Sequence, residues 1–351
     1  MKYLMVSSYP PMKCGIGAYA FQMVKSLESQ GNTVDVLTPY EGNGTVKSDL
    51  KGGCNILKLI NFAKGYDKII IQYHESFYFQ NGSSRITRSP IKTQIAFLIL
   101  FVALRHRIEV IIHEIPYSHP SQFYHFLEKM KWYVCPRIIF HTQVEVDSFS
   151  HSYFIPRRPQ FEIDEHNRYF IKYCDEPKKE SRKKLDLSPH SVIFLCIGFI
   201  QPHKGFDRAL ETFRGTSRKM ELYIVGALRV ETDEYVGYLH QLKKTAEQME
   251  NTFIMDKYLS DEEFDLWINA SDVVVIPYRE IWSSSVLARA KLFGKPIIAC
   301  KTGGLENQIT VSDLLFTDDS ELREIFTEFS SAVESNCNRM HTIHDSPREM
   351  I

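Results

Sequence analysis

A lysine in the second half of the chain is placed to bind an anion. Lys204 lies in the segment from Gly198 to Asp207, which follows the apolar run Val192–Leu195 and precedes a helical pattern. An ammonium group just beyond a buried strand can hold a diphosphate and stabilise the negative charge that develops on it as it leaves. Lysine is also mostly an exposed residue, so a solvated surface side chain is the alternative interpretation.

A second anion-binding signal is a run of hydroxyl groups at the predicted start of a helix. Ser283, Ser284 and Ser285 follow the apolar run Val273–Ile276 and precede Val286. Serine at such a position is often a simple helix cap. The hydroxyls and the free N–H groups of a first helical turn can also bind phosphate oxygens, and we favour this second interpretation.

Two glycines near the N-terminus form a weaker signal. Gly15 and Gly17 follow the apolar run Met1–Val6 and open a helix, where free N–H groups favour an anion or a hydroxyl-rich ligand. A strand-to-helix turn also needs glycine for backbone reasons alone. The spacing does not match G-x-G-x-x-G with an acidic residue about 20 positions later, which disfavours a nicotinamide-dependent enzyme.

Histidines and an amide follow strands of the first half and are candidates for binding a second substrate. His113 ends the run Val110–Ile112, where an imidazole can orient or polarise a hydroxyl group. Gln72, His74 and His141 end two other runs and either line a pocket or cap the sheet. The histidines have no regular spacing, so we expect no metal site and no other cofactor.

The elements that must position these residues form a repeated strand–helix pattern. Continuous apolar runs predict strands covered by helices on both faces, as in parallel α/β sheets. The runs are Met1–Val6, Ile69–Ile71, Val110–Ile112, Ile138–Phe140, Val192–Leu195, Leu222–Val225, Val273–Ile276 and Pro296–Ala299. Between them, Ser260 and Glu263 form a capping box, which predicts a helix that ends near Ser271.

Chain length and one polar segment predict two domains. A chain of 351 residues exceeds what one hydrophobic core usually organises. The proline-punctuated stretch from Pro156 to Glu180 separates two sets of strands. We therefore predict a Rossmann-like domain over residues 1–160, a second over 161–335, and a tail or crossover segment over 336–351. Two doubly wound domains would form a cleft at the carboxyl ends of their strands.

Composition restricts the partners and the compartment. The chain is 44% hydrophobic and 24% charged, and its formal net charge of -1 supplies no basic field for nucleic acid. The 7 cysteines form no C-x-x-C pair and are odd in number, which fits neither a disulfide framework nor a zinc cluster. We expect a cytoplasmic protein.

The most apolar stretch, Ile95–Leu104, falls well short of the roughly 20 residues that span a bilayer. We interpret it as a buried core helix. Its basic flank, Arg105–Arg107, leaves peripheral membrane contact of the N-terminal domain, on the cytoplasmic face, as the alternative.

Taken in order, these segments resemble the retaining family 4 glycosyltransferases, the glycosyl transferases group 1, over nearly the whole chain. The similarity is greatest in the C-terminal half, in Ala270–Tyr278, Ser283–Leu287, Gly294–Ala299 and Gly303–Leu305. In addition, Gly15–Gly17 looks like the family's glycine loop, His113 falls where its cleft histidine lies, and Gly198–Gly205 resembles its diphosphate-binding segment. The resemblance implies an α/β GT-B fold, in which two Rossmann-like domains face a central cleft, and a metal-independent reaction.

Two positions depart from the family pattern. The family commonly has an arginine after the glycine that corresponds to Gly198, and this chain has Phe199. The family also has a glutamate that contacts the donor ribose where this chain has Arg289. A guanidinium cannot accept hydrogen bonds from a ribose, but it can approach a phosphate.

The combined expectation is transfer of a hexose from a nucleotide sugar to a hydroxyl of a glycan or lipid-linked sugar, with retention of configuration, in surface or exopolysaccharide synthesis. His113 and Lys204 are the expected catalytic residues. The expected donor-binding residues are Gly15, Gly17, Gly198, Lys204, Ser283, Ser284, Ser285, Val286 and Arg289, and Gln72, His74 and His141 are expected on the acceptor side. The alternatives are an inert glycosyltransferase-like scaffold, motivated by Phe199 and Arg289, and a sugar isomerase, for which no acid–base pair is evident.

Overall fold

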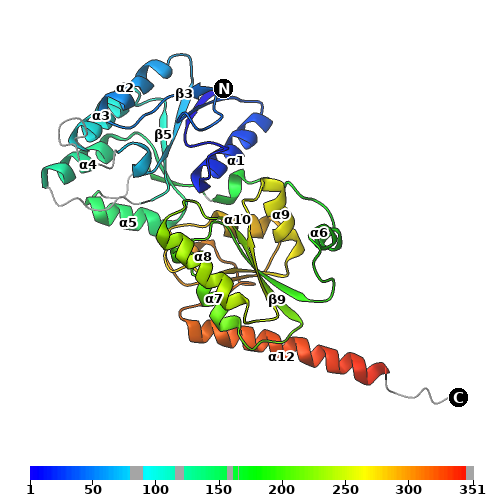
Figure 1. Cartoon of the computed structure of the whole chain (residues 1–351). Coiled ribbons are helices and arrows are strands. Elements are labelled where there is room, and N and C mark those ends of the chain that lie inside the picture. Colours follow the sequence, from blue (N-terminus) through cyan, green and yellow to red (C-terminus); the bar gives the residue numbers. More distant parts are fainter. Residues whose placement is uncertain (80–89, 115–121, 156–160, 165, 345–351) are drawn as a thin grey trace. The chain divides into compact units, whose positions relative to one another are not determined.

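The chain folds into two compact units. The computed structural model describes residues 1–79, 90–114, 122–155, 161–164 and 166–344 (Figure 1). The first unit spans Met1–Ile171 and the second Lys172–Ile351. Each unit is built on its own parallel sheet.

In the first unit, the described residues form a sheet of 7 parallel strands in the order β3-β2-β1-β4-β5-β6-β7. The strands are β1 (Lys2–Val6), β2 (Thr33–Thr38), β3 (Val46–Lys47), β4 (Lys68–Tyr73), β5 (Ile108–Ile112), β6 (Ile138–Phe140) and β7 (Phe161–Ile163). The helices are α1 (Gly15–Ser29), α2 (Gly53–Phe62), η1 (Glu75–Phe77), α3 (Pro90–Ala103), α4 (Gln122–Val134), α5 (Gln143–Tyr153) and η2 (His166–Tyr169). The direction of winding reverses between β1 and β4, and ligands of such sheets bind beyond the carboxyl ends of the strands at this point.

In the second unit, the described part of the chain forms a sheet of 6 parallel strands in the order β10-β9-β8-β11-β12-β13. The strands are β8 (Val192–Ile197), β9 (Met220–Gly226), β10 (Thr252–Asp256), β11 (Val273–Ile276), β12 (Ile297–Cys300) and β13 (Leu314–Phe316). The helices are α6 (Lys178–Lys184), η3 (Pro202–Lys204), α7 (Phe206–Phe213), α8 (Asp233–Ala246), α9 (Asp261–Ala270), α10 (Ser285–Leu292), α11 (Leu305–Gln308) and α12 (Asp319–His344). Here the winding reverses between β8 and β11.

The core of the second unit forms around β8, because this strand is a continuous apolar run with a neighbour on each side. β8 pairs with β9 and with β11. Phe194 of β8 packs edge-on against Phe213 of α7 and Phe326 of α12, at ring-centroid distances of 5.6 and 5.4 Å. These buried contacts fix the strands from which the loops after β8 and β11 depart.

The strands predicted from apolar runs are all present. The runs correspond to β1, β4, β5, β6, β8, β9, β11 and β12. The capping box is also confirmed, because Ser260 and Glu263 exchange hydrogen bonds at the start of α9, which ends at Ala270. The runs do not indicate β2, β3, β7, β10 and β13, which are short, alternating or partly exposed.

The boundary between the units lies at residue 171 rather than 160. Residues 161–163 form β7, which pairs with β6 and therefore extends the first sheet. At the other end, residues 336–344 continue the long helix α12, and residues 345–351 lie outside the described part of the chain.

Candidate functional site

Lys204 lies at the reversal point of the second sheet. β8 leads into Gly198 and η3, and β11 leads into Pro277. Because β8 and β11 are adjacent and parallel, both loops leave the same edge of the sheet. Lys204 therefore lies where open α/β sheets bind their ligands.

The Lys204 ammonium group is half-buried over an aromatic ring. Its Nζ lies 3.8 Å from the ring centroid of Tyr278, a side chain that is 1% exposed. Burial lowers the pKa of Lys204 to about 7, and no carboxylate among the described residues counters this effect. An anionic ligand would supply the missing counter-charge.

A second positive charge, that of Arg229, lies near the loop of Lys204. The pKa of His203 is lowered to about 4, first by burial and then by the charges of Lys204 and Arg229. Arg229 follows β9, the strand next to β8. Cationic groups from two adjacent loops thus give this edge of the sheet a positive potential, which favours a phosphate-bearing ligand.

Arg279 ties the loop of Lys204 to the loop after β11. Its guanidinium donates to the two carboxylate oxygens of Asp207 at 2.8 and 2.6 Å, and to the carbonyl oxygen of Pro202 at 2.8 Å. Its backbone N–H donates to the carbonyl oxygen of His203 at 2.8 Å. Sequence reasoning misses this clamp because Arg279 and Asp207 are 72 positions apart. In the sequence, the one feature that points to these two residues is that each lies at the edge of a predicted site segment.

Two glycines allow the loop after β8 to lie close to the loop after β11. Gly205 has φ 62°, and a Cβ atom there would collide with the carbonyl oxygen of Pro277. Gly198 has φ 125°, a conformation that side-chain-bearing residues rarely adopt, although a Cβ atom would lie 3.7 Å from Val286. Gly198 and Val286 therefore face each other across the two loops.

The three serines before α10 have different surroundings. Ser284 is the N-cap residue: its Oγ accepts a hydrogen bond from Leu287 N at 3.2 Å, and its own N–H donates to Gln308 at 2.8 Å. Ser284 is 2% exposed, so the capping interpretation holds for its hydroxyl. Ser283 and Ser285 are partly exposed at the N-terminus of the helix. These two hydroxyls remain candidates for contacting a ligand.

Arg289, predicted as a donor-binding residue, is held by carboxylates of a neighbouring helix. Its Nε and Nη2 donate to Asp265 Oδ1 at 2.9 and 2.5 Å, and its Nη1 donates to Asp261 Oδ1 at 2.7 Å. The Phe264 ring lies 4.4 Å from the guanidinium carbon. The two carboxylates are one turn apart on α9, so they hold a long cation of α10 between the helices. Arg289 therefore links α9 to α10, and its guanidinium is already matched by carboxylates.

Phe199 presents an aromatic ring where the resembled family has a second cation. Its ring centroid lies 6.3 Å from that of Tyr258, which follows β10, and the two planes are inclined by 31°. The Phe199 ring therefore gives this part of the site an aromatic surface. Because position 199 carries no positive charge, Lys204 does not share the binding of an anion with an arginine there.

In the first unit, the structure brings three predicted residues together around Tyr19. His113 Nε2 lies 2.5 Å from Gln72 Oε1, and the imidazole packs edge-on to Tyr19 at a centroid distance of 5.5 Å. His141 packs against the same ring at 5.4 Å, and its Nδ1 donates to the carbonyl oxygen of Asp164 at 2.9 Å. We call Tyr19, Gln72, His113 and His141 the histidine cluster. Sequence reasoning misses Tyr19, whose only signal is its position one helical turn after Gly15.

Both imidazoles of the histidine cluster are neutral at pH 7. Burial lowers the pKa of His113 well below its ordinary value, and His141 and His74 lower it further. Burial also lowers the pKa of His141 to about 4, against the opposing effect of Asp164. A neutral His113 can orient a hydroxyl by hydrogen bonding. The buried His141 ring packs against it at a centroid distance of 5.4 Å.

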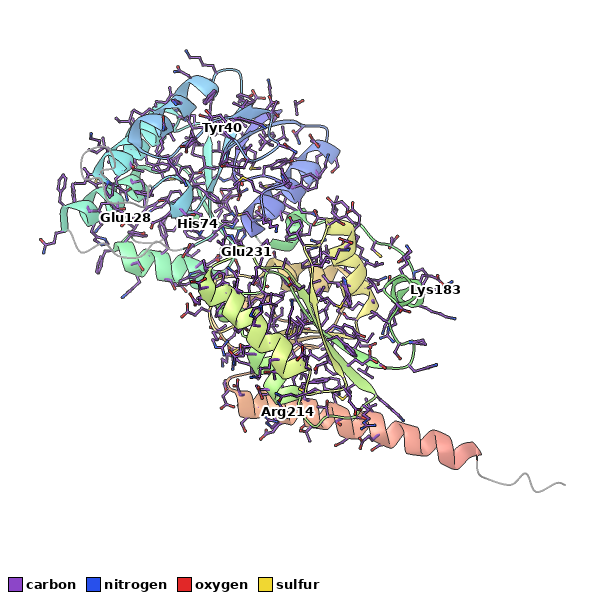
Figure 2. The ribbon with its side chains drawn as sticks, in the orientation of Figure 1. Tyr40, His74, Glu128, Lys183, Arg214 and Glu231 are labelled. Atoms are coloured by element: carbon purple, nitrogen blue, oxygen red, sulfur yellow. The ribbon has the colours of Figure 1, made fainter. Side chains whose placement is uncertain are left out.

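His74 forms a separate pair outside the histidine cluster. Its Nε2 lies 2.6 Å from Glu114 Oε2, and its Nδ1 accepts a hydrogen bond from Ser76 N at 3.2 Å. The acceptor role of Nδ1 places the proton on Nε2, where Glu114 binds it. Figure 2 labels His74 among the side chains of the first unit.

The glycine turn before α1 shows one packed and one open position. A Cβ atom at Gly17 would lie 3.2 Å from Ser8, so this glycine allows α1 to pack against the loop after β1. A Cβ atom at Gly15 would meet no atom within 4 Å. Gly15 therefore leaves space at the N-terminus of α1, whereas Gly17 has a packing role.

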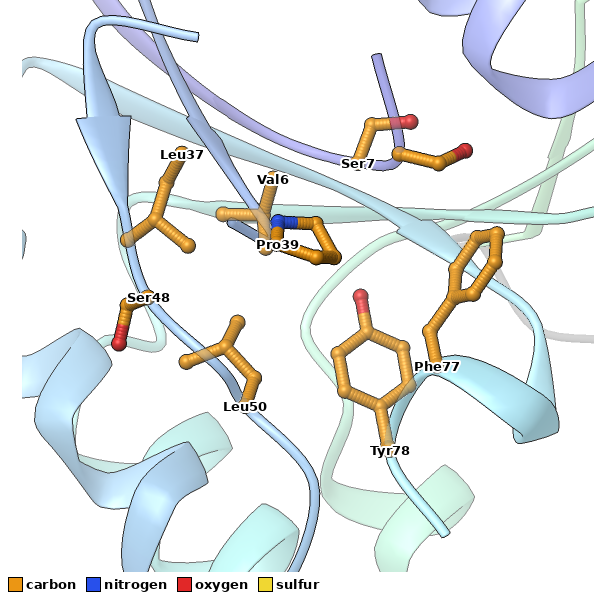
Figure 3. A pocket seen from close by; sticks show the side chains of 9 residues that line it. Val6, Ser7, Leu37, Pro39, Ser48, Leu50, Phe77 and Tyr78 are labelled. Atoms are coloured by element: carbon orange, nitrogen blue, oxygen red, sulfur yellow. The ribbon is translucent and has the colours of Figure 1, made fainter. Parts of the chain in front are cut away.

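A small, partly open pocket lies at the carboxyl ends of β1 and β2 (Figure 3). Its walls are mainly apolar, with three serines, and comprise Val6, Ser7, Ser8, Leu37, Pro39, Ser48, Leu50, Phe77 and Tyr78. Ser7 is 3% exposed, and its hydroxyl has no hydrogen-bond partner among the described residues. The pocket belongs wholly to the first unit and contains none of the predicted site residues.

Comparisons with known proteins agree with this architecture. Residues 177–329 match the sequence profile of the family "Glycosyl transferases group 1". No curated protein has detectable sequence similarity to the chain.

Solved structures are similar over both units. The Anabaena protein HepE in complex with UDP and glucose has a TM-score of 0.64 at 16% identity, over 97% of this chain and 94% of that one. Sucrose-phosphate synthase from Thermosynechococcus elongatus has a TM-score of 0.64 at 15% identity, over 98% of each chain. The catalytic domain of starch synthase IV from Arabidopsis thaliana, bound to ADP and acarbose, has a TM-score of 0.64 at 13% identity, over 95% and 92%. The chain therefore has the GT-B fold, and its second unit matches the glycosyl transferases group 1.

Proposed function

We propose that this protein is a glycosyltransferase that moves a hexose from a nucleotide sugar to an acceptor hydroxyl and retains the anomeric configuration. The observation that carries the proposal is the Lys204 ammonium group. It is half-buried, has a pKa near 7, and has no carboxylate partner in the described chain. A diphosphate is a ligand of the charge and size that such a site favours.

Lys204 acts on the leaving group in this proposal. The bond between the anomeric carbon and the diphosphate oxygen breaks, and Lys204 stabilises the charge left on that oxygen. The Ser283 and Ser285 hydroxyls and the first-turn N–H groups of α10 bind the remaining phosphate oxygens. The acceptor oxygen then bonds to the same face of the sugar, and its proton passes to the leaving phosphate. No side-chain base and no metal ion is needed for this step.

The histidine cluster serves the sugar and the acceptor. His113 is neutral and half-buried, so it positions a hydroxyl by hydrogen bonding and does not supply a charge. Gly15, with open space around it, leaves room for the donor sugar at the start of α1. We propose a glycan or lipid-linked sugar as the acceptor, in cytoplasmic assembly of surface or secreted polysaccharide.

The donor is proposed to be a uridine or adenosine diphosphate sugar. UDP, UDP-glucose and ADP are the nucleotide ligands named for the similar solved structures. Phe199 and Tyr258 offer aromatic surfaces near the start of the Lys204 loop.

A catalytically inert scaffold is the second candidate, and two observations favour it. Phe199 leaves Lys204 without the arginine that the resembled family has beside it. Arg289 occupies the position of a ribose-binding carboxylate and is held between Asp261 and Asp265. A scaffold would fold normally and turn over no donor.

Thermal unfolding with UDP-, GDP- and ADP-sugars and the free nucleotides tests the donor site. A ligand that binds only the folded protein raises its apparent stability. We expect a stabilising shift with one nucleotide class, its loss in Lys204→Ala, and no change in Lys244→Ala, an exposed lysine of α8. A shift that persists in Lys204→Ala, or no shift with any nucleotide, contradicts the proposed site.

A further inference from the structure

Two adjacent helices of the first unit expose apolar side chains to solvent. α3 packs between α2 and α4, and the three helices lie side by side in Figure 1. The exposed apolar side chains are Ile95, Ile99 and Val102 on α3 and Phe123, Phe126 and Tyr133 on α4, each between 41% and 60% exposed. Phe154, at the end of α5, is 71% exposed and lies under Lys129 of α4.

This exposure corrects the expectation that residues 95–104 form a buried core helix. Only one side of α3 is buried, with Phe97, Leu100 and Phe101 fully inside. Ile95, Ile99 and Val102 are spaced by four and three positions, so they form a second apolar stripe on the outer side. A helix that is apolar all round needs a second apolar environment.

The exposed charged side chains on α2, α3 and α4 themselves are all positive. α2 and α3 contain no carboxylate, and the only carboxylate of α4, Glu128, is fully buried. Lys58, Lys92, Arg105 and Arg107 are exposed on or directly after these helices. We call this outer side of α2, α3 and α4 the basic apolar face.

We propose that the basic apolar face docks on the surface of an anionic phospholipid bilayer. The isoleucine, valine and phenylalanine side chains enter the boundary between headgroups and acyl chains, and the lysines and arginines contact lipid phosphates. The proposed contact is peripheral, and within the described residues no helix is long and apolar enough to cross a membrane. A second copy of the chain is a poorer partner, because two faces of the same charge repel each other.

Vesicle flotation with the full chain tests the apolar part. The probes are vesicles of phosphatidylglycerol with phosphatidylcholine and vesicles of phosphatidylcholine alone. We expect the double variant Ile99→Asp with Phe126→Asp to bind the anionic vesicles at least about tenfold more weakly. The matched control is Val230→Asp with Val311→Asp, which alters two exposed valines of the second unit and should leave binding unchanged.

A second pair of variants tests the charge part. Each lysine near an anionic membrane surface strengthens binding on the order of fivefold. The double variant Lys58→Glu with Lys92→Glu should therefore weaken binding to the anionic vesicles by more than about fivefold for each lysine replaced. Binding of the wild-type protein should also fall as salt is added. Equal binding to phosphatidylcholine vesicles overturns the electrostatic part of the proposal.

Two further outcomes overturn the proposal entirely. One is that the wild-type protein does not float with anionic vesicles. The other is that it self-associates in gel filtration and Ile99→Asp with Phe126→Asp abolishes this association without affecting flotation. The thermal stabilisation by nucleotide should be the same in these variants as in the wild-type protein. A failure of the membrane proposal can therefore be told apart from a failure of the proposed donor site.

Discussion

At the scale of single residues, the proposed function depends on a cation that has no carboxylate partner among the described residues. Lys204 lies over Tyr278, and burial alone lowers its pKa to about 7. By contrast, the guanidinium of Arg289, which is more deeply buried, is matched by two carboxylates. The unmatched cation is therefore the one suited to a transient anionic ligand, and the matched cation stabilises the fold.

The pKa of Lys204 predicts how nucleotide affinity depends on pH. Above about pH 7 the free site loses its proton, and a diphosphate must restore it on binding. Affinity for UDP or ADP should therefore fall as the pH rises above 7, by up to about tenfold per unit. Calorimetric titration on both sides of pH 7 measures this slope.

Lys204→Arg is the control for this pH dependence, because a guanidinium stays protonated over the whole range. The variant should bind with a much flatter profile above pH 7, and the comparison cancels the ligand's own titration. Identical slopes in the two proteins would exclude Lys204 as the titrating group.

At the scale of elements, the site depends on two helices and two loops that the fold holds together. Arg279 and Asp207 join the loop after β8 to the loop after β11. Arg289 joins α10 to α9, so the helix whose N-terminus faces the site cannot shift along its neighbour. The residues that form these links take no part in the proposed reaction, but they hold in place the loops and the helix that carry the reacting groups.

Arg289→Ala should destabilise the second unit without weakening nucleotide binding. The change leaves Asp265, which is 1% exposed, without its cation, and breaking a buried pair in this way costs about 3–5 kcal/mol. Urea unfolding measures the loss of stability, and titration with the nucleotide measures binding below the transition.

The double variant Arg289→Leu with Asp265→Leu should recover part of that stability, because no charge is then left buried at position 265. If Arg289→Ala instead kept its stability and lost affinity for the nucleotide, Arg289 would belong to the donor site after all.

At the scale of the whole molecule, the sequence predicts the architecture better than the site. β11 and β12 could be predicted because buried parallel strands are continuous apolar runs, whereas β10, at the sheet edge, is largely exposed and gives no such signal. Lys204 was identifiable from its position after a strand. The partners of Arg289 were not, since Asp261 and Asp265 are more than 20 positions away and no local pattern relates them.

The most direct test of the account is turnover of the nucleotide sugar that stabilises the protein. With water as the acceptor, the wild-type protein should release the nucleoside diphosphate, and Lys204→Ala should slow this release by about 100-fold or more. Nuclear magnetic resonance of the first-formed sugar should show the anomeric configuration of the donor. A donor that binds at Lys204 and is never cleaved, or one released with inverted configuration, would contradict the proposed retaining transfer.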